Sequence, residues 1–199
     1  MRQVLMCSPD FFAVRYSINP WMHVGSVDQE KAKMQWQQLV GTLQQLGVFV
    51  ETISQVAEFP DMVFAADQGI VRDKSVVLST FRYPERQGET THYRQWFTDN
   101  GYQIHHTKGY YEGGDLLAFQ GEFFLGTGFR SQEESAIFLS QILSTQVHQL
   151  TLCDEHFYHL DTCLFPLDER TAFYYPKAFS AASLQTLQQQ IPTLIELTD

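Results

Sequence analysis

The chain has few cysteines, few basic residues and no long apolar run, and each shortage excludes a class of protein. Its three cysteines are an odd number without a Cys-x-x-Cys pair, which argues against a disulfide scaffold and for a reduced, cytoplasmic protein. The formal net charge of −10 disfavours nucleic acids and anionic membranes as partners. No apolar stretch has the length needed to span a bilayer, and we expect neither a signal peptide nor a membrane anchor.

What remains is the composition of a globular domain. Hydrophobic residues make up 44% of the 199 residues and aromatic residues 14%, which is enough for a sizeable core. We expect residues 1–199 to form a single domain. The acid excess fits a cationic small ligand and fits simple solubility equally well.

Hydrophobic periodicity and turn residues predict a strand–strand–helix–strand unit that recurs along the chain, with helices starting near residues 27, 88, 131 and 181. Two of these starts have a capping-box pattern, Ser26 with Gln29 and Ser131 with Glu134. Residues 158–164 are predicted to be a strand. The first helix has an apolar face that we expect in the core: Ala32, Trp36, Leu39, Val40, Leu43 and Leu46.

Four carboxylates stand where predicted strands are interrupted: Asp61, Asp67, Glu112 and Asp115. Two glycines separate Glu112 from Asp115, and their backbone freedom lets both acids turn toward one point. Neighbouring acids repel each other unless a cation lies among them, and a planar guanidinium matches paired carboxylates. The alternative is a set of solvated loop carboxylates that form no site.

Imidazole and guanidinium groups accompany these acids. His159 with Asp161 supplies a group able to transfer protons near neutral pH, although most histidines are hydrogen-bonded bystanders. Arg86 and Arg130 stand in turn-like stretches near predicted helix starts. Either arginine could clamp a substrate carboxylate bidentately, and either could form an ordinary surface salt bridge.

The sequence gives little support to a metal or cofactor site. A metal could be held by His156, His159, Asp161 and Cys163, but no zinc-site spacing is matched, so we expect no metal. Neither a Gly-x-Gly-x-x-Gly motif nor a phosphate-binding loop occurs, and we expect no cofactor.

Six short motifs, in this order, resemble the guanidino-group modifying superfamily, which includes dimethylarginine dimethylaminohydrolases, arginine deiminases, amidinotransferases and arginine dihydrolases. The resemblance covers essentially the whole chain. The motifs are Ile-Asn-Pro-Trp-Met (18–22), Phe-Pro-Asp-x-Val-Phe-x-x-Asp (59–67), Arg-x-Gly-Glu (86–89), Glu-Gly-Gly-Asp (112–115), Gly-x-Arg-Ser (128–131) and His-Leu-Asp-Thr (159–162).

The resemblance implies an α/β fold of the pentein type, a propeller of five strand–strand–helix–strand modules, of which about four are expected here. It implies hydrolysis of the guanidino group of arginine or a methylated arginine. In that chemistry a cysteine attacks the guanidinium carbon, and a histidine protonates the departing amine and then activates water.

The motif match also implies roles for individual residues. His159 is the implied acid and base, Glu112 the carboxylate that holds the guanidinium, and Asp161 a catalytic member of the histidine motif. Substrate-binding roles are implied for six further residues: Asn19, Asp61, Asp67, Arg86, Asp115 and Arg130.

The family's nucleophilic cysteine lies near the C-terminus, and we expect it beyond residue 199. On a strand, the side chain of Cys163 would lie about 13 Å from that of His159, so we interpret Cys163 as a packing residue. Two alternatives to an arginine-type hydrolase stay open. One is a catalytically incomplete remnant that binds guanidino compounds or forms oligomers, and the other is an amidinotransferase. The expected partner is a small guanidino substrate, with a homo-oligomer as a further possibility.

Overall fold

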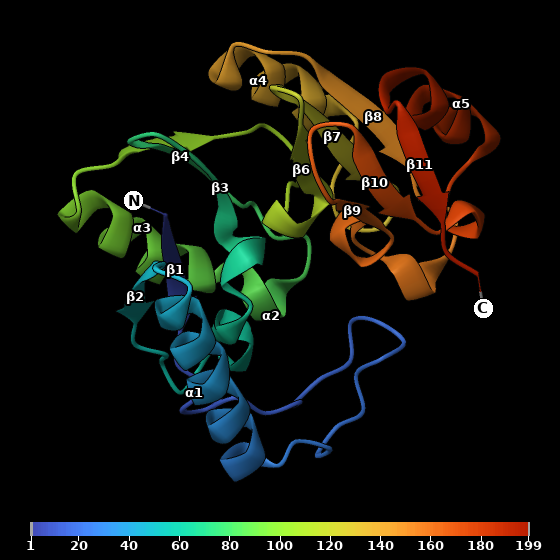
Figure 1. Ribbon diagram of the computed structural model, residues 1–199. Coiled ribbons are helices and arrows are strands. Elements are labelled where there is room, and N and C mark those ends of the chain that lie inside the picture. Colours follow the sequence, from blue (N-terminus) through green and yellow to red (C-terminus); the bar gives the residue numbers. More distant parts are fainter. Residues whose placement is uncertain (1, 199) are drawn as a thin grey trace. The chain divides into compact units, whose positions relative to one another are not determined.

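The computed structural model describes residues 2–198, which divide into two compact units (Figure 1). Unit 1 comprises the chain up to Ala65 together with Tyr83–Trp96, and unit 2 comprises Ala66–Arg82 and the chain from Phe97 onward. Among the described residues no helix is long and apolar enough to cross a membrane.

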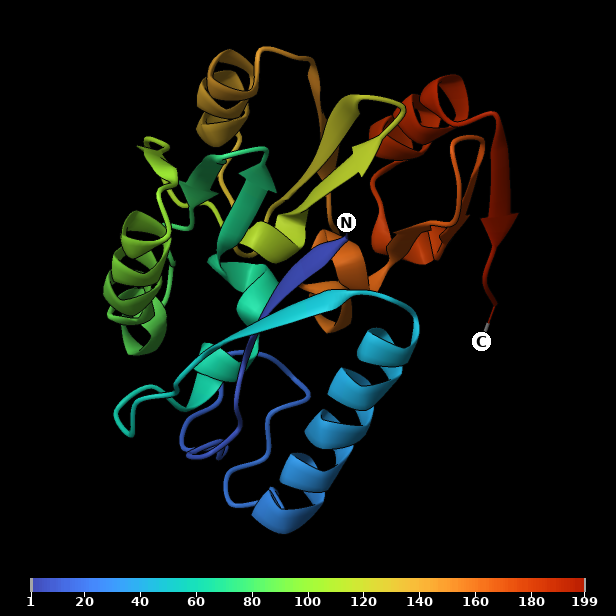
Figure 2. The same cartoon turned by 60° about the vertical axis from the view of Figure 1, so that its left-hand side comes forward.

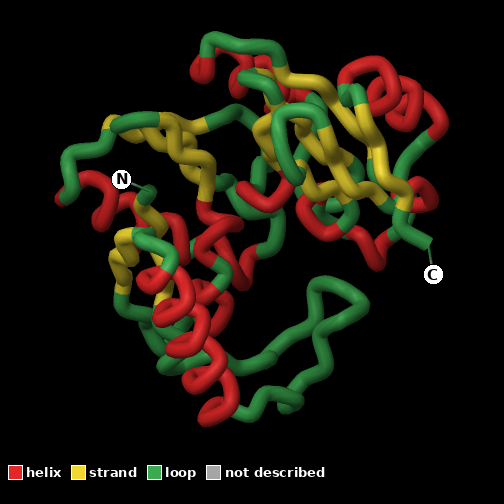
Figure 3. Tube along the Cα trace, viewed as in Figure 1, coloured by secondary structure: helices red, strands yellow, loops and turns green. Residues whose placement is uncertain are grey.

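Unit 1 is built on two parallel strands, β1 (Gln3–Cys7) and β2 (Phe49–Ile53), connected through helix α1 (Gln29–Gln45). A long loop leads from β1 to α1 (Figure 3). Four further elements follow: the 3₁₀ turns η1 (Pro60–Val63) and η2 (Ala65–Gln68), the short helix α2 (Pro84–Gln87) and helix α3 (Glu89–Asp99). The last residue of η1 and the first of η2 are separated by Phe64 alone, and η2 continues into unit 2.

Helix α1 corrects two expectations from the sequence. The capping box of Ser26 and Gln29 does not form, because the carboxylate of Asp28 caps the helix and accepts a hydrogen bond from the amide of Lys31 at 3.0 Å. The predicted core face is only partly covered: Ala32, Trp36, Val40 and Leu43 are half-buried, whereas Leu39 and Leu46 are exposed. The sheet beside α1 has two strands within the described chain, where each sheet of unit 2 has three.

Unit 2 contains three sheets that share one topology (Figure 2). In each sheet the middle strand pairs antiparallel with the strand before it and parallel with the strand that follows the intervening helix. The predicted strand–strand–helix–strand order is therefore confirmed in these three repeats. They are β3 (Gly69–Arg72), β4 (Ser75–Leu78), β5 (Gln103–His106); β6 (Leu116–Phe119), β7 (Glu122–Thr127), β8 (Val147–Thr151); and β9 (Leu164–Pro166), β10 (Thr171–Tyr174), β11 (Thr193–Glu196).

Local sequence explains a hairpin turn, a helix cap and a core contact in the repeats of unit 2. Gln120 and Gly121 both have positive φ in the two-residue connection between β6 and β7, as a tight hairpin requires. Ser180 caps helix α5 (Ala181–Gln190) by accepting from the amide of Ser183. Leu187 on this helix is fully buried in an apolar cluster with residues of β7, β8, β9 and β10, and burying one such side chain contributes about 1.5–3 kcal/mol.

Two local predictions in unit 2 are wrong, and both errors concern the candidate site. Helix α4 (Glu134–Leu143) begins without a side-chain cap, because Ser131 hydrogen-bonds to Asp115 instead of to the helix. Residues 158–164 do not form one strand: a 3₁₀ turn, η5 (Leu160–Thr162), precedes the short strand β9, and the carboxylate of Asp115 accepts from the amide of Leu160. Long-range hydrogen bonds to one buried acid override the local patterns in both places.

Candidate functional site

Four segments of unit 2 converge on a buried cluster of polar side chains. Glu112 directly precedes the 3₁₀ turn η3 (Gly113–Asp115), and Arg130 lies in the loop between β7 and α4. His159 directly precedes η5, and Asp67 belongs to η2. The charged and imidazole groups of Glu112, Asp115, Arg130 and His159 are each at most 3% exposed.

The glycine pair of η3 permits this convergence. A Cβ atom on Gly114 would lie 2.7 Å from His159 Nδ1 and 2.8 Å from Asp67 Oδ1, so no larger residue fits there without displacing both groups. A Cβ atom on Gly113 would lie 2.2 Å from the carbonyl oxygen of Ala66. The glycines between Glu112 and Asp115 therefore serve close packing, since neither has a positive φ.

Glu112 is the most connected acid of the cluster. Its Oε1 accepts from the amide of Arg82 at 3.1 Å. Its Oε2 lies 2.9 Å from Arg130 Nη1, a fully buried ion pair, and 3.0 Å from His159 Nε2. The carboxylate is therefore fixed on both oxygens, and its orientation is set before any ligand arrives.

His159 lies between two carboxylates. Its Nε2 contacts Glu112, and its Nδ1 lies 3.5 Å from Asp67 Oδ1. Burial by itself would lower the pKa of His159, but the charges of Asp67, Asp115 and Glu112 and the hydrogen bond to Glu112 outweigh it and raise the pKa to about 9. The side chain is therefore an imidazolium at neutral pH, with a proton to donate.

Asp161 is the second acid of the histidine motif and stands within η5. Burial raises its pKa to about 6, and the charge of Asp67 acts in the same direction while the charge of His159 opposes it. A Cβ on Gly114 would lie 3.1 Å from Asp161 Oδ2, so this carboxylate faces the same narrow space as His159.

Arg130 is held by an aromatic ring as well as by Glu112. Its guanidinium carbon lies 4.7 Å from the ring centroid of Tyr158, within the range of a cation–π contact. The ring of Tyr158 also lies 4.9 Å, centroid to centroid, from that of His159. Tyr158 thus links the arginine and the histidine of the cluster.

Three predicted site residues belong to unit 1. Asp61, in η1, is 2% exposed and accepts from the hydroxyl of Tyr16 at 2.9 Å. Arg86, in α2, is buried and donates through both Nε and Nη2 to Glu89 at 3.0 Å, and through Nη2 to the carbonyl of Asp61. Asn19 lies in the loop before α1, where its side-chain oxygen accepts from the amide of Trp21.

Sequence reasoning missed several partners of the predicted residues. Arg82 contributes its backbone amide to Glu112, and its side chain bonds the carbonyl of Phe129, contacts that leave no signature in the sequence. Ser131 could have been found, because it ends the Gly-x-Arg-Ser motif. Tyr158 could also have been found, because it is the aromatic residue directly before His159. Glu89, the partner of Arg86, closes the Arg-x-Gly-Glu motif.

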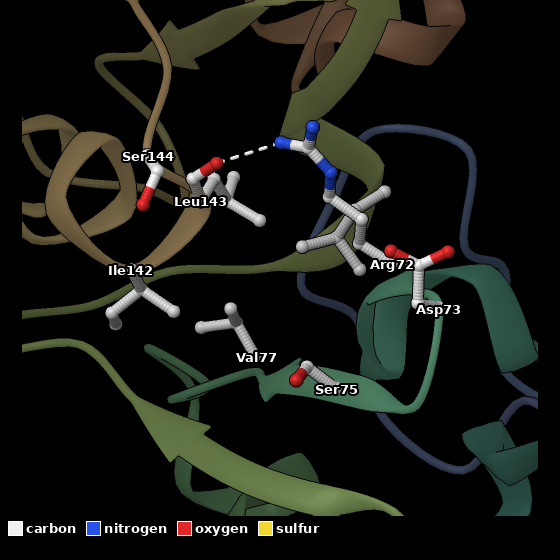
Figure 4. Close-up of a pocket in the computed structure, with 8 residues that line it drawn as sticks. Arg72, Asp73, Ser75, Val77, Ile142, Leu143 and Ser144 are labelled. Carbon is white, nitrogen blue, oxygen red and sulfur yellow. Dashed lines mark hydrogen bonds between the residues drawn. The ribbon is translucent and has the colours of Figure 1, made fainter.

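A cavity elsewhere in unit 2 contains none of the predicted site residues. It measures about 280 Å³ and is lined by residues of β3, β4 and the C-terminal end of α4, as Figure 4 shows. Arg72 reaches across it to donate to the carbonyl of Leu143 at 2.6 Å. Within residues 2–198, no group of three or more His, Cys, Asp and Glu side chains is arranged to hold a metal ion.

Comparison with known proteins gives the family. Residues 18–198 match the family described as N,N dimethylarginine dimethylhydrolase, eukaryotic. The bifunctional arginine dihydrolase/ornithine cyclodeaminase ArgZ of Synechocystis sp. is 39% identical over 197 residues, which are 96% of this chain and 28% of that protein. An N(G),N(G)-dimethylarginine dimethylaminohydrolase of Mycobacterium tuberculosis is 40% identical over 196 residues, 98% of this chain and 65% of that protein.

Solved structures agree with this result. The N-terminal domain of ArgZ bound to substrate, an arginine dihydrolase from cyanobacteria, has a TM-score of 0.95 and 39% identity, covering 99% of this chain and 76% of that one. A DDAH from Pseudomonas aeruginosa complexed with citrulline has a TM-score of 0.81 at 20% identity, a likeness of fold, over 99% of this chain and 76% of that one.

The chain therefore belongs to the N,N dimethylarginine dimethylhydrolase family, within the guanidino-group modifying superfamily. Its α/β fold matches the solved structures of that superfamily. The chain spans less than two thirds of the length of the Synechocystis and M. tuberculosis relatives.

Proposed function

We propose that this chain acts in the hydrolysis of the guanidino group of arginine or a methylated arginine. The observation that supports this most is the arrangement of His159 in unit 2. The imidazolium is held between Glu112 and Asp67, in a buried cluster where carboxylates outnumber cationic side chains. Such a cluster favours a planar cation with many N–H donors. The curated relatives named above include hydrolases of arginine and of dimethylarginine.

The proposed reaction uses the groups of unit 2 in turn. Glu112 and Asp67 hold the guanidinium, and a cysteine thiolate attacks its central carbon. The imidazolium of His159 then gives a proton to the departing nitrogen, which leaves as an amine. The neutral imidazole that results takes a proton from water, whose hydroxide attacks the thiouronium carbon and releases the thiolate. A pKa near 9 for His159 suits the first of these proton transfers.

Five further residues keep the roles that the resemblance implies, as part of the proposal. Asp161 assists His159, and Arg130 binds the α-carboxylate of the substrate. Asn19, Asp61 and Arg86, all in unit 1, are substrate-binding residues by motif match. The bidentate contact with Glu89 fixes the orientation of the Arg86 guanidinium.

We propose that the nucleophile belongs to a part of the protein outside residues 1–199. Neither buried cysteine is suited to the role, since burial raises the pKa of Cys7 to about 12 and that of Cys163 still further. The thiol of Cys163 also donates to the carbonyls of His159 and Leu160, away from the imidazole nitrogens. We further propose that residues 1–199 form one propeller domain of four modules, and that a fifth module carries the nucleophile.

A second candidate function follows from the same cysteine observation. If none of its three cysteines acts as the nucleophile, the chain would bind guanidino compounds without cleaving them, as a ligand-binding or oligomer-forming protein. An amidinotransferase is the third candidate, which the His-Leu-Asp motif at 159–161 allows.

Reading the coding DNA past codon 199 separates these candidates. The proposal expects an in-frame continuation that contains a cysteine, and the longer protein should release ammonia or an alkylamine from arginine or its methylated forms. Citrulline or ornithine is identified by chromatography, and amidino transfer is tested by adding glycine as acceptor. A matched variant, His159→Gln, should lose turnover while still folding. A stop after codon 199, with no turnover by the 199-residue protein, would leave the binding candidate in place of the hydrolase.

A further inference from the structure

Asp115 occupies an unusual position in the candidate site. It is 1% exposed, and three donors from two different loops converge on its carboxylate. Its Oδ2 accepts from both the amide and the hydroxyl of Ser131, at 3.1 and 2.6 Å, and its Oδ1 accepts from the amide of Leu160 at 3.1 Å. Both oxygens are therefore engaged by the protein itself.

The two loops held in this way carry the charged partners of Glu112. Ser131 directly follows Arg130, and Leu160 directly follows His159. The hydroxyl of Ser131 in addition accepts from the amide of Glu112 at 3.0 Å. A displacement of Asp115 would thus move the arginine, the histidine and the acid between them.

The packing around Asp115 leaves no space for a ligand on the Leu160 side. A Cβ atom on Gly126, the last residue but one of β7, would lie 3.0 Å from Asp115 Oδ1 and 2.9 Å from Leu160 Cβ. Strand β7 therefore packs directly against this hydrogen bond. Asp115 is 1% exposed, so a substrate ammonium or guanidinium would have to displace this packing to reach its carboxylate.

We infer that Asp115 is a positioning residue that fixes the Arg130 and His159 loops, and that it does not bind substrate. This inference rests on the proposed function because it takes Arg130 and His159 to act on a substrate. The hydrogen bonds that hold their two loops do not depend on that function. A single carboxylate satisfies two backbone amides that would otherwise be buried without acceptors, which is costly in a protein interior.

The charge of Asp115 adds an electrostatic consequence. Burial raises the pKa of Asp115 to about 7, while its contacts with His159 and Ser131 favour the charged form. The other acids around His159 are Asp67, Glu112 and Asp161. The charge of Asp115 is one of the causes that raise the pKa of His159, so removing Asp115 should lower that pKa.

The test is Asp115→Asn in the 199-residue chain, with Asp73→Asn as control. Asparagine has the same shape but only one acceptor oxygen, so it can hold one loop and not both. Asp73 is an exposed residue of unit 2 with φ of 55°, a conformation that asparagine tolerates, so the control also removes one negative charge. Histidine-selective NMR titration follows His159, and amide exchange follows Leu160 and Ser131.

For Asp115→Asn we expect a lower pKa of His159 and at least a tenfold faster exchange of one of the two amides. Asp73→Asn should change neither. In the parent chain, saturating L-arginine should leave both amides protected, because a positioning residue keeps its bonds when ligand binds. Unchanged exchange and an unchanged His159 titration in Asp115→Asn would overturn the inference, and so would deprotection of both amides by arginine.

Two further experiments cover the cases in which the first gives no answer. If Asp115→Asn does not fold, Ser131→Ala removes one of the three hydrogen bonds to Asp115 and retains the Asp115 carboxylate. It should speed exchange of the Ser131 amide, which donates to the same oxygen of Asp115, and an unaltered Ser131 amide would overturn the inference. If the parent chain does not bind arginine, the proposed function fails, while the exchange and titration data still decide the role of Asp115.

Discussion

Replacing Glu112 by glutamine should destabilise unit 2 by about 3–5 kcal/mol, the usual cost of removing one partner from a buried ion pair. Glu112 is fully buried, and its Oε2 is shared by Arg130 at 2.9 Å and His159 at 3.0 Å. In Glu112→Gln the amide oxygen can still accept from Arg82, but the NH₂ group then faces two cationic donors. The charge of Arg130 is left buried beside it.

The matched control is Glu122→Gln, also in unit 2. Glu122 is 43% exposed and pairs with His148 at 2.6 Å, and an exposed pair of this kind contributes about 1 kcal/mol or less. Both variants remove one carboxylate that contacts a basic side chain, and they differ in burial and in the fixed charge of Arg130. The ratio of the two losses in unfolding free energy therefore measures how much burial adds to the contribution of the carboxylate.

The assay is urea unfolding followed by far-UV circular dichroism. Tryptophan fluorescence would be a poor probe, because all three tryptophans of the chain belong to unit 1. We expect the Glu112→Gln transition at clearly lower urea than the parent, and that of Glu122→Gln close to the parent. Equal losses of unfolding free energy in the two variants, or a higher unfolding free energy in Glu112→Gln, would refute the electrostatic reasoning.

Three further predictions concern charge, reactivity and capping. The pKa of His159 is raised to about 9 in the folded state. The protonated side chain therefore stabilises the fold fully below its unfolded pKa of about 6.5, and this contribution is lost as pH rises through about 9. Urea unfolding at several pH values measures this loss. Iodoacetamide should label the exposed Cys153 at least tenfold faster than the buried Cys163, as measured by peptide mass spectrometry. Ser180→Ala removes the cap of α5 and the hydrogen bonds to Ser183, and its unfolding free energy should fall by about 1 kcal/mol.

The repeated order of strands and helices could be predicted from the sequence because its signals are local. The sequence predicts a helix that starts near residue 181, and α5 spans Ala181–Gln190 in the structure. Apolar alternation and turn residues such as Gly121 fix these elements without reference to distant parts of the chain. The resemblance carried by six motifs gave the family and the residues to inspect.

The features that escaped prediction depend on distant partners. Ser131 has the sequence context of a helix cap, and residues 158–164 have the pattern of a strand, yet Asp115 holds both segments in other conformations. The apolar residues of α1 have the spacing of a core face, but spacing does not reveal whether a protein surface lies opposite. A buried acid with three donors can only be recognised from coordinates.

The most direct test of the proposed guanidino site is calorimetric titration of the 199-residue chain with L-arginine and, separately, with L-lysine. The two ligands carry the same charge, but lysine lacks the planar group that paired carboxylates recognise. We predict that arginine binds at least tenfold more tightly than lysine, and that Glu112→Gln removes this preference. Equal binding of both ligands, or no arginine binding at millimolar concentration, would contradict a guanidinium site built around Glu112 and His159.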